Sequence, residues 1–367
     1  MDLRLLGWNA HWRDLFAPYV SDSLSPGRVI AEHRGGYIVE SERGARGAVL
    51  GGRLRHHAAT RSALPAVGDF VAVRLAKEGS GDGPAVIDGV LQRRTAFIRR
   101  TAGTRSDDQV IAANVDVVFV MLGLDHDFNV RRVERYLAAV WDSGATPVVL
   151  LNKSDLCERL DPRTDDLRRA GMGVAVHPLS ALHADGFDAL WPYLREGTTV
   201  GVVGSSGVGK STLLNRLFGR DAQTTADVRA HDSRGRHTTT HRELFVLPEG
   251  GIVIDTPGMR EFQLSASSDL SEHSNADGVE TVFGEIEQLA ARCRFTDCTH
   301  ESEPGCAVRE AVEQGRLTAE RLASYEKLMK ELRYEAARSD PSARGERKRV
   351  GRIGAKAARR MYRERRR

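Results

Sequence analysis

Long apolar stretches are absent from this sequence. The longest unbroken run lies at Val117–Leu124, far short of the about 20 residues that a membrane-spanning helix needs. The N-terminus carries charged residues around Trp8 and Trp12 and has no small-residue cleavage pattern, so it does not resemble a signal peptide. We therefore expect a cytoplasmic protein with no membrane partner.

Cysteine is scarce, with four in the chain of 367 residues. Three of them, Cys293, Cys298 and Cys306, crowd together beside His300, whereas Cys157 stands alone. In a cytosolic protein such a cluster favours a metal site over disulfides. Cys157 is typical of a small packing residue.

Internal repeats of roughly 20 to 50 residues are also missing. The length exceeds that of one ordinary core, so two or three domains are expected. The net charge of +4 conceals an asymmetry, because residues 344–367 hold twelve Lys or Arg against two Glu. This segment is too charged to fold alone and suits binding to a phosphate backbone, with a solubilising tail as the alternative.

Short β-like runs separated by turn residues fill residues 28–100. Five such runs are visible, the last of them continuous over 85–98, and the loops are basic. This pattern predicts a small barrel. An OB-fold is favoured and a plain SH3-like barrel is the alternative, because periodicity alone does not separate the two.

Strand-like and helix-like runs alternate from about Asn114, which predicts a parallel α/β sheet. Three apolar runs end at Leu151, Val203 and Ile254, each directly before a polar motif. Open α/β sheets place their ligands at this end of their strands. A helical pattern then covers the region around the clustered cysteines.

A phosphate-binding loop is indicated by GSSGVGKS at 204–211, which fits the GxxxxGK[ST] pattern between a strand-like and a helix-like run. We expect the backbone N–H groups to hold phosphates, Lys210 to reach the β/γ oxygens and Ser211 to bind Mg²⁺. A glycine-rich turn with a chance Lys-Ser pair is the alternative. The predicted contact residues are Gly204, Ser205, Ser206, Gly207, Val208, Gly209, Lys210, Ser211 and Thr212.

The tetrapeptide Asn152-Lys153-Ser154-Asp155 resembles the base-reading NKxD element of guanine-specific GTPases. The resemblance implies that the carboxylate of Asp155 pairs with the N1 and N2 donors of guanine, an arrangement that adenine does not offer. The tripeptide Ser180-Ala181-Leu182 resembles the companion SAK/SAL loop, whose backbone contacts guanine O6.

The tetrapeptide DTPG begins at Asp255, ends at Gly258 and resembles the DxxG element of GTPases. Asp255 would hold Mg²⁺ through water, and the N–H of Gly258 would contact the γ-phosphate. Alone this motif is weak evidence, because an Asp-x-x-Gly turn is common on protein surfaces.

The polar stretch 221–242, which contains GRHTTT, lies where a nucleotide-ordered switch belongs. We expect Thr240, or else Thr239, to bind Mg²⁺ in the GTP state. Met259 occupies the position at which many GTPases carry the Gln that orients the attacking water, so slow intrinsic hydrolysis is expected. His237 is the nearest candidate for a replacement, and a solvated or RNA-facing His is the alternative.

These motifs occur in circularly permuted order, because Asn152 and Ser180 precede Gly204. Permutation leaves spatial neighbours unchanged when the old termini can be joined at the surface. The order, the RGRHTTT switch, the basic barrel and the Cys/His cluster together resemble the ribosome small-subunit-dependent GTPase family known as RsgA or YjeQ. The resemblance covers the chain from about Arg28 to Lys330.

The family resemblance implies a multi-domain fold, GTP and GDP as ligands, and the small (30S) ribosomal subunit with its rRNA as partner. The implied function is GTP hydrolysis, stimulated by the subunit, in late maturation of that subunit. We expect a monomer. The predicted domains are an N-terminal extension (1–27), an OB-fold RNA-binding domain (28–100), a circularly permuted α/β P-loop GTPase domain (101–264), a helical zinc-binding domain (265–338) and a basic tail (339–367).

Cys293, Cys298, His300 and Cys306 fit the family's zinc pattern without departure. Three thiolates and one imidazole complete a tetrahedral shell and leave no position for water, so we expect one structural Zn²⁺ per chain. Three buried cysteines without metal are the alternative. The closed ligand set disfavours a zinc hydrolase, and a GTP-gated RNA-binding module with incidental hydrolysis is the competing function.

Overall fold

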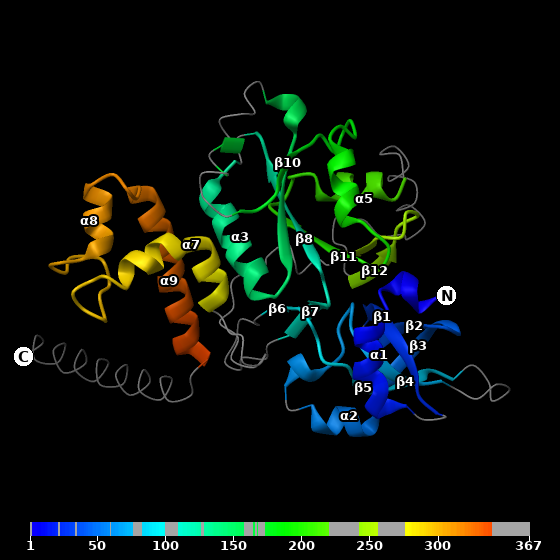
Figure 1. Ribbon diagram of the computed structural model, residues 1–367. Coiled ribbons are helices and arrows are strands. Elements are labelled where there is room, and N and C mark those ends of the chain that lie inside the picture. Colours follow the sequence, from blue (N-terminus) through cyan, green and yellow to red (C-terminus); the bar gives the residue numbers. More distant parts are fainter. Residues whose placement is uncertain are drawn as a thin grey trace, which may run out of the picture. The chain divides into compact units, whose positions relative to one another are not determined.

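The computed structural model (Figure 1) forms two compact units, Met1–Leu264 with His273–Val282 and Ser265–Glu272 with Phe283–Arg367. No helix in the described part of the chain is both long and apolar enough to span a membrane. The described residues are 2–20, 23–33, 35–58, 60–75, 83–99, 109–125, 128–157, 164–165, 167, 173–219, 242–255 and 276–339.

Five strands near the N-terminus close into a barrel. They follow the order β1-β2-β3-β5-β4, and pairing of β4 with β1 closes the ring. Buried valines and Ile87 fill its interior. The closed five-stranded barrel confirms the predicted OB-fold. Its elements are β1 (Ser25–His33), β2 (Gly36–Ser41), β3 (Gly44–Leu50), the helices α2 (Gly52–His57) and η3 (Arg61–Ala63), β4 (Phe70–Arg74) and β5 (Ala85–Val90).

The N-terminal segment, for which the sequence indicated no role, packs on this barrel. Trp12 and Phe16 are buried, and the ring centroid of Trp12 lies 4.5 Å from that of Phe70 on β4. Burial of these aromatic rings supplies most of the apolar contact that fixes the segment. Its elements are the 3-10 helix η1 (Leu3–Leu6), the helix α1 (Ala10–Phe16) and the 3-10 helix η2 (Ala17–Tyr19).

The run 85–98, predicted as one continuous strand, divides into two. Between its halves lies Arg93, whose Nη2 is 2.7 Å from Oδ2 of Asp69 in a buried ion pair. The second half joins a separate two-stranded sheet formed by β6 (Ala96–Arg99) and β7 (Gln109–Ala113). The predicted domain boundary at residue 100 lies outside the described residues and stays a prediction.

A six-stranded sheet follows, in the order β10-β9-β8-β11-β13-β12, and all its neighbours except β13 and β12 are parallel. Its central strands are almost wholly apolar and buried, as expected for strands covered on both faces. The predicted parallel α/β sheet is confirmed. The strands are β8 (Val117–Gly123), β9 (Thr146–Asn152), β10 (Val176–Pro178), β11 (Thr199–Gly204), β12 (Arg242–Val246) and β13 (Ile252–Asp255).

Helices cover both faces of this sheet, and Figure 1 shows α3 and α5 on opposite sides of it. Asn129 caps α3 by accepting a hydrogen bond from the N–H of Arg132. Leu213 and Leu217 of α5 pack into the core around Phe119. These helices are α3 (Val130–Asp142) and α5 (Lys210–Leu217), with 3-10 turns at η4 (Ser154–Leu156) and η5 (Phe187–Tyr193).

The C-terminal unit is helical, as predicted. The backbone of α7 departs from helical geometry at Phe283, with φ −118° and ψ 25°. The buried Phe283 ring meets Tyr325 edge-on with centroids 5.6 Å apart, and the Tyr325 hydroxyl donates to Glu287 at 2.6 Å. The helices of this region are α7 (Ala276–Ala290), α8 (Ala307–Glu313) and α9 (Ala319–Ser339).

Candidate functional site

Four polar motifs meet at one edge of the parallel sheet. Asn152 ends β9, Ser180 follows β10, Gly204 ends β11 and Asp255 ends β13. Because β10, β9, β11 and β13 run in the same direction as β8 between them, their carboxyl ends share this edge. An open α/β sheet binds its ligands there.

The loop between β11 and α5 depends on glycine. Gly209 has a φ of 106°, and a Cβ atom there would lie 2.1 Å from the side-chain nitrogen of Asn152. Gly204 has a φ of 147°, and its Cβ would lie 2.4 Å from the carbonyl oxygen of Met121. Any larger residue at either position would push the loop off the sheet edge.

Lys210 opens α5 and turns back over the loop. Its Nζ donates to the carbonyl oxygens of Gly204 at 2.7 Å and Ser205 at 2.5 Å. The ammonium group therefore lies within the curve of the loop, where a phosphate oxygen would meet it. Ser211 and Thr212 follow on the first turn of the helix.

The side chain of Asn152 connects two loops that are distant in the sequence. Its Nδ2 donates to the carbonyl of Val208 in the 204–211 loop at 2.7 Å, and its Oδ1 accepts from the N–H of Ala181 at 2.8 Å. Asn152 is 3% exposed, so neither bond competes with much water. One amide thus sets the spacing between the phosphate loop and the loop after β10.

Asp155 lies at the open side of the same region, with its side chain 26% exposed. A hydrogen bond from the Ser180 side chain holds the pKa of Asp155 below its ordinary value. The carboxylate is therefore ionised at neutral pH and can accept two hydrogen bonds from a ligand. The ring of His183 lies 3.9 Å away.

The loop that begins at Ser180 is a tight turn. Ser180 and Asp185 exchange backbone hydrogen bonds of 3.0 and 3.2 Å. A residue outside this loop also contacts it, because Nη2 of Arg216 on α5 donates to the carbonyl of Leu182 at 2.7 Å. The turn is thereby fixed to the helix that follows the phosphate loop.

Two contributors, Asp125 and Arg216, were missed by the sequence analysis. Asp125 lies just after β8 and accepts a hydrogen bond of 2.5 Å from the side chain of Lys153, a predicted site residue whose backbone is left-handed with φ 66°. The place of Asp125 at a strand end was a usable signal, since the other motifs share it. Arg216 had no such signal, because its contact depends on how α5 packs.

Several predicted residues lie outside the described part of the chain. These are His237, Thr239, Thr240, Gly258 and Met259, and their roles stay predictions. Of the DTPG motif the structure describes Asp255, at the end of β13. The roles assigned to the residues that do meet at the sheet edge are likewise predictions that the geometry permits.

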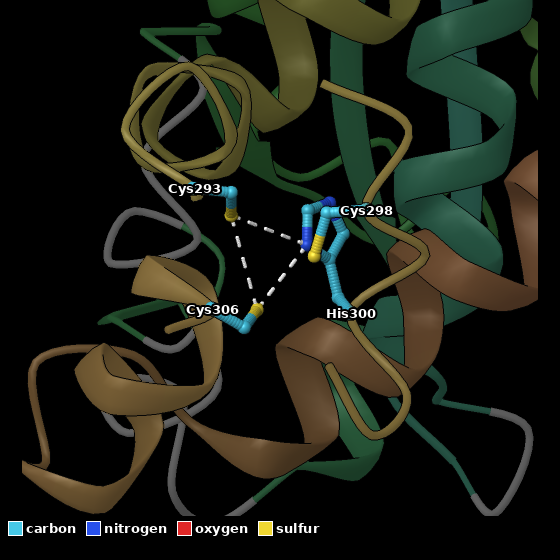
Figure 2. A group of neighbouring side chains, drawn as sticks. All are labelled: Cys293, Cys298, His300 and Cys306. Atoms are coloured by element: carbon cyan, nitrogen blue, oxygen red, sulfur yellow. Dashed lines mark hydrogen bonds between the residues drawn. The ribbon is translucent and has the colours of Figure 1, made fainter. Parts of the chain in front are cut away.

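The Cys/His cluster forms a second site, in the C-terminal unit. The ligand atoms of Cys293, Cys298, His300 and Cys306 all lie within 4.8 Å of one another, and Figure 2 shows the four side chains pointing toward a common centre. His300 and Cys306 are buried.

The spacing of these atoms fits a tetrahedral ion. Sγ of Cys293 lies 3.7 Å from Nδ1 of His300 and 3.9 Å from Sγ of Cys306, which in turn lies 3.4 Å from Nδ1 of His300. With bonds of about 2.3 Å to sulfur and 2.0 Å to nitrogen, ligands of tetrahedral zinc lie roughly 3.5–3.8 Å apart. The cluster is compatible with one zinc site.

The pKa values of two thiols in this cluster shift in opposite directions. Burial raises the pKa of Cys293, but hydrogen bonds from the N–H groups of Val308 and Ala307 and from the other two thiols outweigh burial and lower the pKa overall. Burial raises the pKa of Cys298 to about 11.

Comparison with known families gives two matches. The family described as RsgA GTPase matches residues 90–265, which hold all four polar motifs of the sheet edge. A family described as ABC transporter matches residues 188–351. That stretch contains the 204–211 loop, a motif common to many proteins that bind nucleotide phosphates.

Curated relatives match over nearly the whole chain. A protein of Opitutus terrae named small ribosomal subunit biogenesis GTPase RsgA is 49% identical, covering 96% of each chain. One of the same name from Syntrophotalea carbinolica is 41% identical and covers 99% of each.

Two solved structures resemble the fold. YjeQ from Thermotoga maritima has a TM-score of 0.59 and 27% identity, covering 84% of this chain and 98% of that one. A structure described as YloQ, a circularly permuted GTPase, has a TM-score of 0.57 and 25% identity, covering 85% and 96%.

Proposed function

The chain belongs to the family of RsgA GTPases, and from this membership we propose that it hydrolyses GTP during late maturation of the small ribosomal subunit. Its relatives are named for biogenesis of that subunit. Binding of the subunit and its rRNA stimulates the hydrolysis. The protein works in the cytoplasm as a monomer.

The observation that supports this proposal best is the double hydrogen bond of Asn152. It joins the carbonyl of Val208 to the N–H of Ala181. In the proposed site the first loop holds phosphates and the second reads guanine O6. A single buried amide therefore connects the loop proposed to bind phosphates with the loop proposed to bind the base, although the motifs are permuted in the sequence.

Different residues at the sheet edge bind the phosphates, the guanine base and the Mg²⁺ ion in this proposal. N–H groups at 204–211 and the ammonium of Lys210 hold the β- and γ-phosphates. The carboxylate of Asp155 accepts hydrogen bonds from N1 and N2 of guanine. Ser211, Thr240 and Asp255 would hold Mg²⁺. When bound with GTP, Mg²⁺ neutralises phosphate charge.

The Cys/His cluster has a structural role in this proposal. Its three thiolates and one imidazole hold one zinc ion per chain and leave no open coordination position. With a small helical core around Phe283 and Tyr325, the C-terminal unit depends on this ion for stability. The domain boundaries given from the sequence belong to the same proposal.

The experiment that tests the proposal compares phosphate release from GTP with and without purified small subunits. We expect stimulation of at least about tenfold, since ordering a catalytic segment contributes factors of this size or larger. Large subunits serve as the control. Nucleotide-dependent subunit binding with an unchanged rate would instead support a GTP-gated RNA-binding module.

A further inference from the structure

The barrel strand β1 continues into the sheet that carries the nucleotide site. Ala31 of β1 pairs with Glu243 of β12, and Glu243 pairs on its other side with Asp255 of β13. Ala31, Glu243 and Asp255 therefore form one row across three hydrogen-bonded strands. Asp255 is the first residue of DTPG, so this row leads from the barrel to the phosphate side of the site.

A polar cluster of three side chains lies beside this row, where β1 of the barrel meets β12 of the sheet. Nη1 of Arg242 lies 2.8 Å from Oε2 of Glu32 on β1. Gln109 of β7 bridges the pair, because it accepts from Nη2 of Arg242 and donates to Oε1 of Glu32, each at 3.4 Å. The side chains of Arg242 and Glu32 are 16% and 23% exposed, so solvent only partly screens their interaction.

This cluster adds to a short pairing between the two strands. The strands β1 and β12 share two residue pairs, Ala31 with Glu243 and Glu32 with Arg242. So short a ladder is weak by itself, whereas a partly buried, charge-assisted hydrogen bond is one of the stronger polar interactions in a protein. Loss of the ion pair would release β12 from the barrel more readily than it would unfold either part.

The sequence position of Arg242 gives the junction its importance. Arg242 opens β12 two residues after Thr240, which holds Mg²⁺ in the proposed function. The strand then turns into β13, which ends at Asp255. One short hairpin therefore carries the attachment points of both segments that would meet the γ-phosphate.

We propose that Glu32 and Arg242, with Gln109, are positioning residues for GTP hydrolysis: they hold the β12–β13 hairpin on the barrel, so that RNA bound to the barrel changes the hydrolysis rate. This inference rests on the proposed function. It assigns to the barrel a mechanical part in catalysis beyond RNA binding, and it names the residues through which the barrel acts.

Charge reversal tests the proposal in the full-length protein. Glu32→Arg and Arg242→Glu each place like charges together, and the double variant restores an opposite pair in swapped positions. We expect each single variant to lower the kcat of GTP hydrolysis by about tenfold, in the basal and the subunit-stimulated reaction, with nucleotide Kd changed less than about twofold. The double variant should recover most of the loss.

The matched control is the ion pair of Arg74 and Asp88, which joins β4 and β5 of the same barrel away from β12. Asp88→Arg should leave kcat unchanged. Circular dichroism and the melting temperature check that every variant is folded.

Unchanged kcat in both single variants, or no recovery in the double variant, would overturn the positioning role. The basal kcat tests that role even if subunits do not stimulate the wild-type protein. A lack of stimulation of the wild-type protein by subunits would contradict the proposed function but not the positioning role.

Discussion

His237 is the residue on which the proposed catalysis depends most. Met259 follows the DTPG motif, and its thioether cannot hydrogen-bond an attacking water as a Gln would. An imidazole can either accept or donate such a bond at neutral pH. If rRNA orders the segment around His237, stimulation follows without any catalytic group from the subunit.

We predict that His237→Ala keeps GTP affinity and subunit association but loses most of the stimulated rate. The reduction should be on the order of 10²-fold, as for loss of a positioned acid–base group. Single-turnover hydrolysis with saturating small subunits measures it, with His11→Ala, an exposed position on α1, as control. Full stimulation of His237→Ala would move the search to ribosomal groups, and lost subunit binding would make His237 an RNA contact.

At the same scale, the sequence located the motifs but not their connections. Asn152, Ser180 and Gly204 were recognisable because short motifs at strand ends have a fixed chemistry. Their joining through one amide, and the support of Leu182 by Arg216, depend on loops that meet only after the sheet forms. Such contacts have no local pattern in the sequence.

The Cys/His cluster governs stability at the scale of the helical elements. Cys306 caps α8, with its Sγ accepting from the N–H of Arg309 at 3.5 Å, so a zinc ion bound there would fix both the loop before the helix and the helix start. Cys293 and Cys298 lie on the segment that follows α7. Metal binding and folding of this unit are therefore coupled.

We predict one zinc per chain, and a Cys298→Ala variant in which the C-terminal unit is destabilised while nucleotide binding persists. Loss of one ligand weakens zinc binding and with it the folding of the unit. Metal analysis, thermal unfolding and nucleotide titration give the three readings, and Cys157→Ala is the matched control. A metal-free native protein of unchanged melting temperature would contradict this role.

Hydrophobic periodicity did not predict all the strand boundaries. The run 85–98 has an unbroken β-like pattern, but the structure divides it into β5 and β6, with Arg93 between them in a buried ion pair with Asp69. The helices of the N-terminal segment also escaped prediction, since their aromatic residues pack on Phe70 of a strand that comes much later in the chain.

At the scale of the whole molecule, Arg28 joins several parts of the chain that are far apart in the sequence. Its guanidinium is fully buried and donates to the carbonyls of Leu6, Gly68 and Asn114 and to the hydroxyl of Thr199. Burial lowers the pKa of Arg28 to about 10, so it keeps its charge at neutral pH. The N-terminal segment, the barrel and the strand of the phosphate loop thus share one cation.

We predict that Arg28→Met destabilises the first unit by about 3 kcal/mol or more, since three buried carbonyls lose a charged donor. The stability of Arg28→Lys should lie between those of the wild type and Arg28→Met, because an ammonium keeps the charge but cannot reach all four acceptors. Urea unfolding measures the difference. As a control, Arg43→Ala at an exposed position on the same barrel should change the stability by less than about 0.5 kcal/mol. A change as small as this in Arg28→Met would show that Arg28 does not stabilise the first unit.

The sequence indicated the three kinds of domain, but it did not indicate that the barrel and the parallel sheet are joined through paired strands. The pairing of β1 with β12 merges the barrel and the parallel sheet into 11 strands, and Arg242 lies 210 positions from Glu32 in the chain. No periodicity spans such a separation. The joint is defined by strand register, by the ion pair of Arg242 with Glu32, and by the hydrogen bond of Arg28 to Thr199.

In the proposed function, the site with Asp155 at its base-reading end performs the subunit-stimulated reaction. Asp155→Asn should prefer xanthosine triphosphate, because the amide donates to its O2 while still accepting from N1. The decisive measurement is phosphate release by this variant with small subunits, using GTP and xanthosine triphosphate in parallel. We predict that the stimulated rate is lost with GTP and restored with xanthosine triphosphate, whereas undiminished stimulated hydrolysis of GTP by Asp155→Asn would contradict the account.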